Sequence, residues 1–138
     1  MIVLDTNVLS EALRPSPELS VLDWLANERR LSLFTTTVTR GEILYGIRLL
    51  ADGKRRRGLW EAAKRIFDED LSGQVLSFDS DAADMYAEIG AVRRTSGKPI
   101  SQFDCMIVAI ARSRGAVLAT RNVKDFEDCG VDLVNPWG

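Results

Sequence analysis

The chain has 138 residues, a formal net charge of −2 and no histidine, and at this length it is expected to form one domain, residues 1–138, with a sizeable core. The lack of histidine excludes serine–histidine–aspartate catalysis and zinc sites that need imidazole, and the net charge argues against binding nucleic acid through bulk positive charge. Because no apolar run could span a bilayer and the N-terminus lacks the basic flank of a signal peptide, we expect a cytoplasmic protein that does not contact membranes.

The first half of the chain alternates short apolar runs, typical of buried strands, with apolar residues at helical spacing. Proline and glycine residues separate these segments. In chain order the predicted elements are a strand at Ile2–Leu4, a helix at Val8–Leu13, a helix at Glu18–Glu28, a strand at Leu33–Thr36, a helix that starts near Thr39 and ends before Gly53, and a helix from Lys54 to about Leu71.

The second half continues this alternation. The predicted elements are a strand at Val75–Phe78, a helix at Asp79–Arg94, an almost wholly apolar helix at Ser101–Ser113, a strand at Ala116–Ala119, a loop with one helical turn, and an edge strand at Asp132–Val134. Cys105, inside the apolar helix, is expected to be a small buried hydrophobic residue. The alternation predicts an α/β fold, a three-layer α/β/α sandwich around a mainly parallel sheet of four to five strands.

Four acidic residues stand where predicted strands end or predicted helices begin. Asp5 follows the first strand, and Glu42 lies at the start of the helix after the second. Asp104 is three residues into the most apolar helix, and Asp125 lies just after the fourth strand. Strand carboxyl ends and helix N-termini share one edge of an open parallel sheet. We therefore expect these four acids, far apart in the sequence, to converge.

Helix capping offers another explanation for each acid taken alone. Glu42 stands three residues after Thr39, and Asp104 three residues after Ser101, which is the spacing of a capping box. Asp5 is placed to cap the helix that follows it, and the fourth acid alone would be a solvated loop charge. Capping does not explain convergence, and it is compatible with metal binding because the field at a helix N-terminus keeps a carboxylate ionised.

Carboxylates that gather without histidine or cysteine favour a hard divalent cation. Repulsion between their charges raises their pKa values unless a cation compensates it. Oxygen ligands favour Mg²⁺ or Mn²⁺, and such ions activate water and stabilise the leaving oxygen in phosphodiester hydrolysis. The sequence therefore predicts metal-assisted hydrolysis with Mg²⁺ as the cofactor and Mn²⁺ as the alternative.

Five segments, taken in order, form a distinctive set. They are LDTNVLSE at 4–11, TRGEILYGI at 39–47, FDCMIVAIA at 103–111, LATRNVKDFE at 118–127 and NPW at 135–137. With this set the whole chain resembles PIN-domain proteins, in particular the VapC/FitB-type ribonuclease toxins of bacterial type II toxin–antitoxin pairs. The resemblance implies a PIN-like sandwich, an Mg-dependent endoribonuclease acting on RNA, a homodimer, and neutralisation by a cognate VapB/FitA-like DNA-binding antitoxin.

The resemblance also implies which residues form the catalytic metal site. Asp5 and Asp104 match the two core metal-ligating aspartates of the family. Glu42 matches the acidic ligand in TRGE, and Asp125 matches a weaker fourth acid. Some relatives carry an acid where this chain has Asn122, so the shell could be completed by Asp125, by Asn122 or by a bridging water.

Other polar and aromatic residues receive supporting roles. By the resemblance, Thr6, Asn7 and Thr120 are expected to position the acids or a water. The basic run at 54–57, KRRR, is typical of a solvated helix face, with contact to an RNA backbone or an antitoxin as the alternative. Three aromatic residues are expected to pack in the core or at a dimer interface rather than stack on bases: Trp24, Tyr45 and Trp60.

Two other functions fit part of the sequence. A haloacid-dehalogenase-type phosphatase also has an aspartate after its first strand, but its chemistry needs a second aspartate two residues on, where this chain has Asn7. A degenerate PIN-like module would bind RNA or protein without cleaving it, and the complete set of four acids argues against that interpretation.

Overall fold

Short apolar runs form the strands of a single sheet. In the computed structural model, which describes residues 1–138, these strands are β1 (Ile2–Leu4), β2 (Leu33–Thr36), β3 (Val75–Leu76), β4 (Val117–Ala119) and β5 (Leu133–Val134). Their order in space is β3-β2-β1-β4-β5, and each neighbouring pair is parallel. The expected parallel sheet is confirmed, and its two edge strands are shorter than predicted because only two residues of each are paired.

Helices lie close to the predicted ranges. They are α1 (Thr6–Ala12), α2 (Leu19–Asn27), α3 (Thr37–Arg48), α4 (Lys54–Arg65), α5 (Ser80–Thr95) and α6 (Gln102–Ser113). Short helical turns add Arg30–Ser32 and Val123–Phe126, and Ile66–Asp70 continues α4 as a π-helical turn. The helix predicted from Lys54 to about Leu71 is therefore one α-helix followed by a wider turn.

The cap of α3 differs from the capping-box prediction. Thr36, the last residue of β2, accepts a hydrogen bond from the backbone N–H of Thr39 at 3.1 Å, so Thr36 and not Thr39 is the N-cap. The reason is that β2 runs into α3 without a loop, which leaves the last strand residue in the cap position. The prediction for Ser101 is confirmed, since its hydroxyl accepts from the Asp104 N–H at 3.3 Å.

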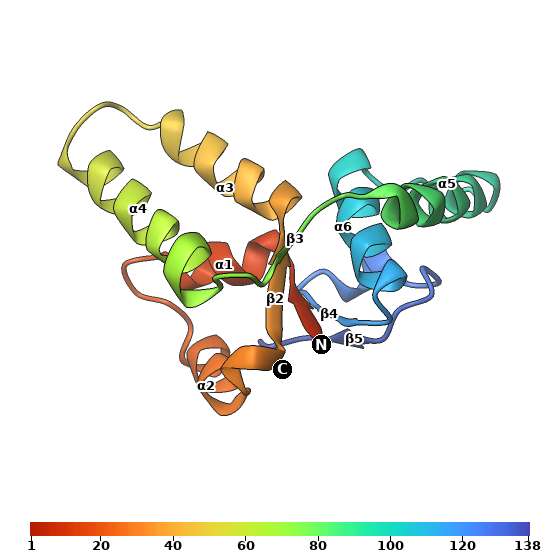
Figure 1. The fold of residues 1–138 in the computed structure, drawn as a ribbon, viewed down its shortest axis with the longest axis horizontal. Coiled ribbons are helices and arrows are strands. Elements are labelled where there is room, and N and C mark those ends of the chain that lie inside the picture. The colour runs from red at the N-terminus through yellow and green to blue at the C-terminus, as the bar shows by residue number, and fades with distance from the viewer.

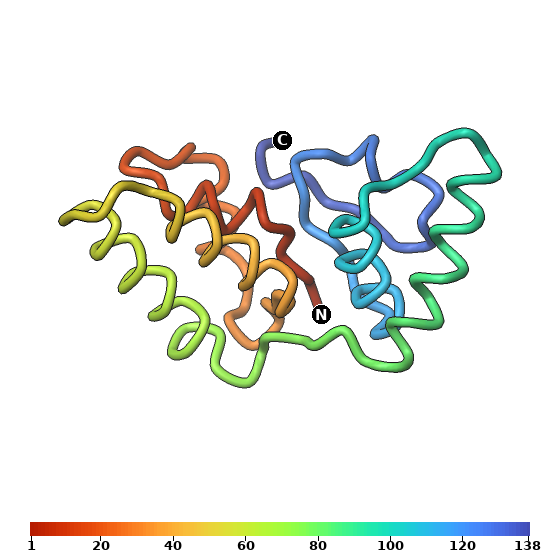
Figure 2. Tube along the Cα trace, turned by 90° about the horizontal axis from the view of Figure 1, so that it is seen from above, coloured from red at the N-terminus to blue at the C-terminus, as the bar shows by residue number.

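The two faces of the sheet are covered by different helices (Figures 1 and 2). Val3 faces a core that includes α5 and α6, while its neighbour Leu4 faces a core that includes α1, α3 and α4. This alternation along one strand is what a sheet buried on both faces requires. The layers are therefore α/β/α, as predicted.

Helix α6 is the most deeply buried helix, as its sequence indicates. Ile107 and Ile110 have no exposed surface, and Cys105 is 2% exposed within the same core.

No helix of the structure combines the length and apolarity that a bilayer crossing requires.

Candidate functional site

Asp5 lies directly after β1, where the strand ends and α1 begins. Its backbone N–H donates to the carbonyl of Ala119 in β4 at 2.9 Å, so the sheet fixes its position. One carboxylate oxygen accepts from the Thr6 N–H and the other from the Thr120 hydroxyl, both at 2.8 Å. The side chain is only 4% exposed.

Burial is the main influence on the charge of Asp5. The pKa of this carboxyl is raised from 3.8 to about 6 as the net result of three influences: burial raises it most, the hydrogen bonds from Thr120 and Thr6 lower it, and the nearby charges of Asp104 and Glu42 raise it. A carboxylate at such a site is stabilised most by a cation, because a cation offsets both the lost hydration and the neighbouring negative charges.

Glu42 is held by a chain of hydroxyl groups that links α3 to α1. The Thr6 hydroxyl donates to Glu42 Oε1 at 2.9 Å. Since that hydroxyl has one proton, the Thr39 hydroxyl, also 2.9 Å away, donates to Thr6 in turn. Burial raises the pKa of Glu42, the hydrogen bond from Thr6 lowers it, and the charge of Asp104 raises it again.

Asp104 approaches from the opposite layer, in the first turn of α6. It is half-buried, and burial raises the pKa of its carboxyl. Hydrogen bonding with Ser101 lowers that pKa, and the charge of Asp125 raises it. Asp104 therefore interacts electrostatically with each of the other three acids.

Asp125 is exposed on the turn at Val123–Phe126. Its backbone carbonyl accepts from the guanidinium of Arg93 at 2.8 Å, and the same guanidinium donates to the carbonyls of Lys98 and Glu127. Arg93 is 8% exposed, so a buried cation in α5 holds the loop that carries the fourth acid. Sequence reasoning missed Arg93, although its place four residues after the buried Ile89 in α5 was a usable signal.

The residues expected to support the acids do contact them or one another. Thr120 binds Asp5, and its hydroxyl also accepts from the side-chain amide of Asn7 at 3.3 Å and from the backbone N–H of Asn122 at 3.1 Å. The side chain of Asn122 makes no hydrogen bond and is exposed. Thr6 holds Glu42 as described, and the role of Thr39 in this network was not foreseen.

The four acids lie at the same edge of the sheet, but they do not form a closed cage. No group of three or more Asp, Glu or Cys side chains has the spacing of a site that ligates one ion directly. An open arrangement fits Mg²⁺, which is commonly held by one or two carboxylates and keeps several waters. A zinc or calcium site would need a fuller set of direct protein ligands.

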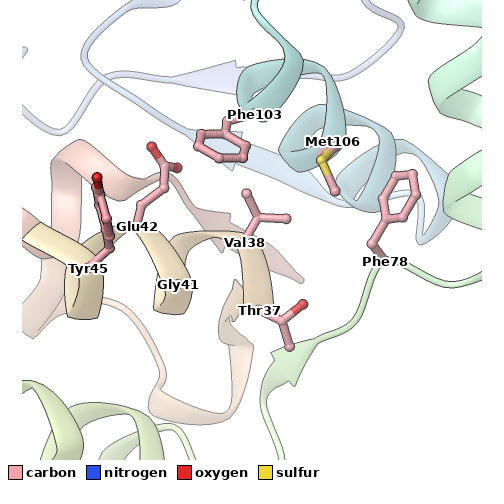
Figure 3. Close-up of a pocket in the computed structure, with 8 residues that line it drawn as sticks. All are labelled: Thr37, Val38, Gly41, Glu42, Tyr45, Phe78, Phe103 and Met106. Atoms are coloured by element: carbon pink, nitrogen blue, oxygen red, sulfur yellow. The ribbon is translucent and has the colours of Figure 1, made fainter.

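A cavity of about 740 Å³ opens beside Glu42, between α3 and α6 (Figure 3). Phe103, Val38 and Met106 line it, and Phe78 lies at the right of the view, across from Tyr45. Tyr45 is 67% exposed at its rim, so Tyr45 does not pack in the core of this chain. Two other aromatic residues do pack against the core, as predicted: Trp24 and Trp60.

Comparison with known proteins places this geometry in a family. The model of the PIN domain matches residues 2–130. The chain is 39% identical over 137 residues to the VapC ribonuclease Y4jK of Sinorhizobium fredii, covering 99% of this chain and 98% of that protein. It is 36% identical over 137 residues to the toxin FitB of Neisseria gonorrhoeae, covering 99% of both.

The fold is matched by a solved structure as well. A chain in the structure of FitAB bound to an IR36 DNA fragment superposes with a TM-score of 0.94 at 36% identity, covering 100% of this chain and 96% of the other. The similarity thus extends over the sheet, both helical layers and the edge where the four acids lie.

Proposed function

Because the chain belongs to the PIN-domain family, we propose that it is the toxin of a type II toxin–antitoxin pair, an endoribonuclease that depends on Mg²⁺ or Mn²⁺. Four acids would hold the ion, directly or through its bound waters: Asp5, Glu42, Asp104 and Asp125. The observation that supports this most is that these acids, from four separate segments, meet at one sheet edge with interacting charges. Burying like charges together is costly unless a cation joins them.

The chain's own residues hold the site ready for the reaction. The Ala119 carbonyl of β4 and the Thr120 hydroxyl fix Asp5, and Thr6 orients Glu42. When bound, a divalent cation supplies the positive charge that activates water and offsets negative charge on the phosphate. No side-chain nucleophile is then needed.

The partners follow from the relatives. FitB is named as a toxin, and FitAB is bound to DNA in the solved structure. By analogy we propose that this chain acts in the cytoplasm on RNA, forms a homodimer, and is neutralised by a cognate VapB/FitA-like DNA-binding antitoxin.

Membership of this family removes the haloacid-dehalogenase alternative. In that chemistry a second aspartate would stand at position 7, and here Asn7 instead uses its amide to donate to Thr120. The degenerate binding module is the remaining rival, and all four acids that cleavage would require are present at the edge of the sheet.

RNA cleavage by the purified protein tests the proposal. We expect RNA to be cut in Mg²⁺ and left intact in EDTA, and we expect Asp5→Asn and Asp104→Asn to lose roughly 100-fold or more in rate, as loss of a transition-state charge partner does. Asp23→Asn, at an exposed position of α2, is the matched control and keeps the parent rate. Folded parent protein that binds RNA but never cleaves it would establish the degenerate module.

A further inference from the structure

A second cavity shares Glu42 with the first but has a different chemical character. It has a volume of about 440 Å³ and lies between α1, α3 and α4. Thr6 and Glu42 line it near the acids, and Arg14 and Arg55 also line it. Arg14 follows the C-terminal end of α1 and Arg55 is in the first turn of α4, so the hollow runs from the acidic site toward a basic end. Its floor is apolar and includes Ile43, Ile47, Leu50 and Leu59.

The cations at the basic end of this cavity do not stabilise the fold. Lys54–Arg57 fill the first turn of α4, where the positive end of the helix dipole disfavours cations. The N-cap is Gly53, which provides no side-chain cap, and the first turn contains no acid. Among these cations only Arg57 has a carboxylate within 4.0 Å, that of Asp52 at 3.9 Å. Local features that oppose the fold often mark functional positions.

We propose that this groove, which we call the α1–α3 groove, carries the sugar–phosphate backbone of the RNA substrate, with Arg55 and Arg14 contacting its phosphates. The inference rests on the proposed ribonuclease function. A strand that passes over the four acids must leave the site along some path. The cavity between α3 and α6 contains no cation, whereas the α1–α3 groove contains two, and a guanidinium pairs well with phosphate.

Neighbouring cations in the first turn of α4 line different cavities. Arg55 lines the α1–α3 groove, while Arg56 lines a different hollow with Arg48 and Trp60. Arg14 is partly engaged, because it pairs with Glu11 at 3.3 Å. Arg55, without a carboxylate partner, is therefore the residue whose removal isolates the RNA contact, and Arg56 is its control within the same helical turn.

The test measures binding of a short labelled single-stranded RNA by fluorescence anisotropy, in EDTA so that it is not cut, over a series of salt concentrations. Loss of one phosphate contact should reduce the slope of log affinity against log salt by about 0.7. We expect this reduction in slope for Arg55→Gln and not for Arg55→Lys, Arg56→Gln or the distant Arg29→Gln. In Mg²⁺, Arg55→Gln should raise the KM for RNA cleavage and leave kcat unchanged.

The outcomes separate this inference from the function on which it rests. A parent protein that neither binds nor cuts RNA overturns both. A parent that cuts RNA while Arg55→Gln keeps the parent slope and KM overturns the groove assignment alone. If Arg55→Gln and Arg56→Gln reduce the salt slope equally, RNA is attracted by the general positive charge of this helical turn, and the groove assignment is also overturned. The assignment is overturned as well if Arg55→Gln binds RNA normally but binds the antitoxin more weakly, since the groove would then receive an acidic peptide.

Discussion

Asp5 is both the N-cap of α1 and the most deeply buried of the four acids. From sequence alone a cap and a metal ligand were equally good reasons for an aspartate at this position. In the structure the cap uses one carboxylate oxygen, bound to the Thr6 N–H, and Thr120 binds the other. A cap at a surface helix is normally solvated, whereas burial raises the pKa of Asp5 to about 6. Capping therefore does not explain why the side chain of Asp5 is buried.

Asp5→Asn is expected to stabilise the metal-free protein. The native state binds a proton at Asp5 more tightly than the unfolded chain does, so stability falls as pH rises from 3.8 to about 6 and the full cost is present above that range. Each unit by which the pKa is raised corresponds to about 1.4 kcal/mol, so the ionised carboxylate lowers the free energy of unfolding by on the order of 3 kcal/mol. Urea unfolding in EDTA should show Asp5→Asn to be more stable than the parent at about pH 7.5, with little difference below about pH 4.

The control for this prediction is Asp23→Asn, which removes an exposed charge and should change stability by no more than about 0.5 kcal/mol at either pH. If Asp5→Asn were less stable than the parent at neutral pH, its carboxylate would be satisfied within the protein and would not need a cation.

Thr120 is expected to control the pH at which the site becomes active. Thr120→Val removes the hydroxyl that lowers the pKa of Asp5. A hydrogen bond to a charged group contributes about 1.5–3 kcal/mol, so the acidic limb of the pH–rate profile should move to higher pH by about one to two units. Thr120→Ser, which keeps the hydroxyl, should restore the parent profile. An unshifted limb in Thr120→Val would show that ionisation of Asp5 does not control activity.

At the scale of single residues, sequence reasoning located the acids better than the groups that hold them. Asp5 and Glu42 follow strands, and that order along the chain indicates a shared edge of a parallel sheet. The hydroxyls of Thr6 and Thr39 were harder to assign, because a threonine in a helix has several local uses. Their contact joins positions 33 residues apart, which no local pattern encodes.

At the scale of elements, α5 supports the site although it contributes no acid to it. Arg93 extends from α5 to three backbone carbonyls of the segments around Lys98, Asp125 and Glu127. Because Arg93 is buried and its guanidinium donates to all three carbonyls, the turn that carries Asp125 depends on a helix from another part of the chain.

Arg93→Met should therefore affect both stability and activity. It leaves the three backbone carbonyls without this donor, which we expect to cost about 2–4 kcal/mol in the free energy of unfolding, and it should lower RNA cleavage because Asp125 loses its support. Arg94→Met, one residue on and exposed, should stay within about 0.5 kcal/mol of the parent. Chemical denaturation and cleavage assays check both effects. Parent-like stability in Arg93→Met would contradict this role for α5.

The boundaries of the elements were predictable where one residue decides them and not where tertiary contacts do. Ser101 caps α6 as its sequence pattern indicates. The start of α3 depends on β2 running straight into the helix, and β3 is only two residues long because of where β2 pairs with it. The π-helical turn after α4 has no sequence signature that distinguishes it from an α-helix.

At the scale of the whole molecule, two cores share one sheet. Adjacent residues of β1, Val3 and Leu4, belong to different cores, so neither helical layer can lose its packing without exposing one face of the same strand. This arrangement predicts that residues 1–138 unfold as one unit.

The prediction is testable because all three tryptophans, Trp24, Trp60 and Trp137, pack against the core of the α1–α4 layer. Tryptophan fluorescence and far-ultraviolet circular dichroism should therefore give the same urea midpoint. Ile107→Ala, in the core of the opposite layer, should cost about 2–5 kcal/mol and lower both midpoints together. Separate midpoints would indicate two independently folding layers.

The measurement that tests the central claim most directly is calorimetric titration of the metal-free protein with Mn²⁺ at neutral pH. If the acids at the sheet edge form one cation site, the parent and Asp23→Asn bind Mn²⁺ equally, while Asp5→Asn and Asp104→Asn each lose at least about 10-fold in affinity. Binding that is unchanged in both variants, or absent from the folded parent, would contradict the claim that these acids hold a metal.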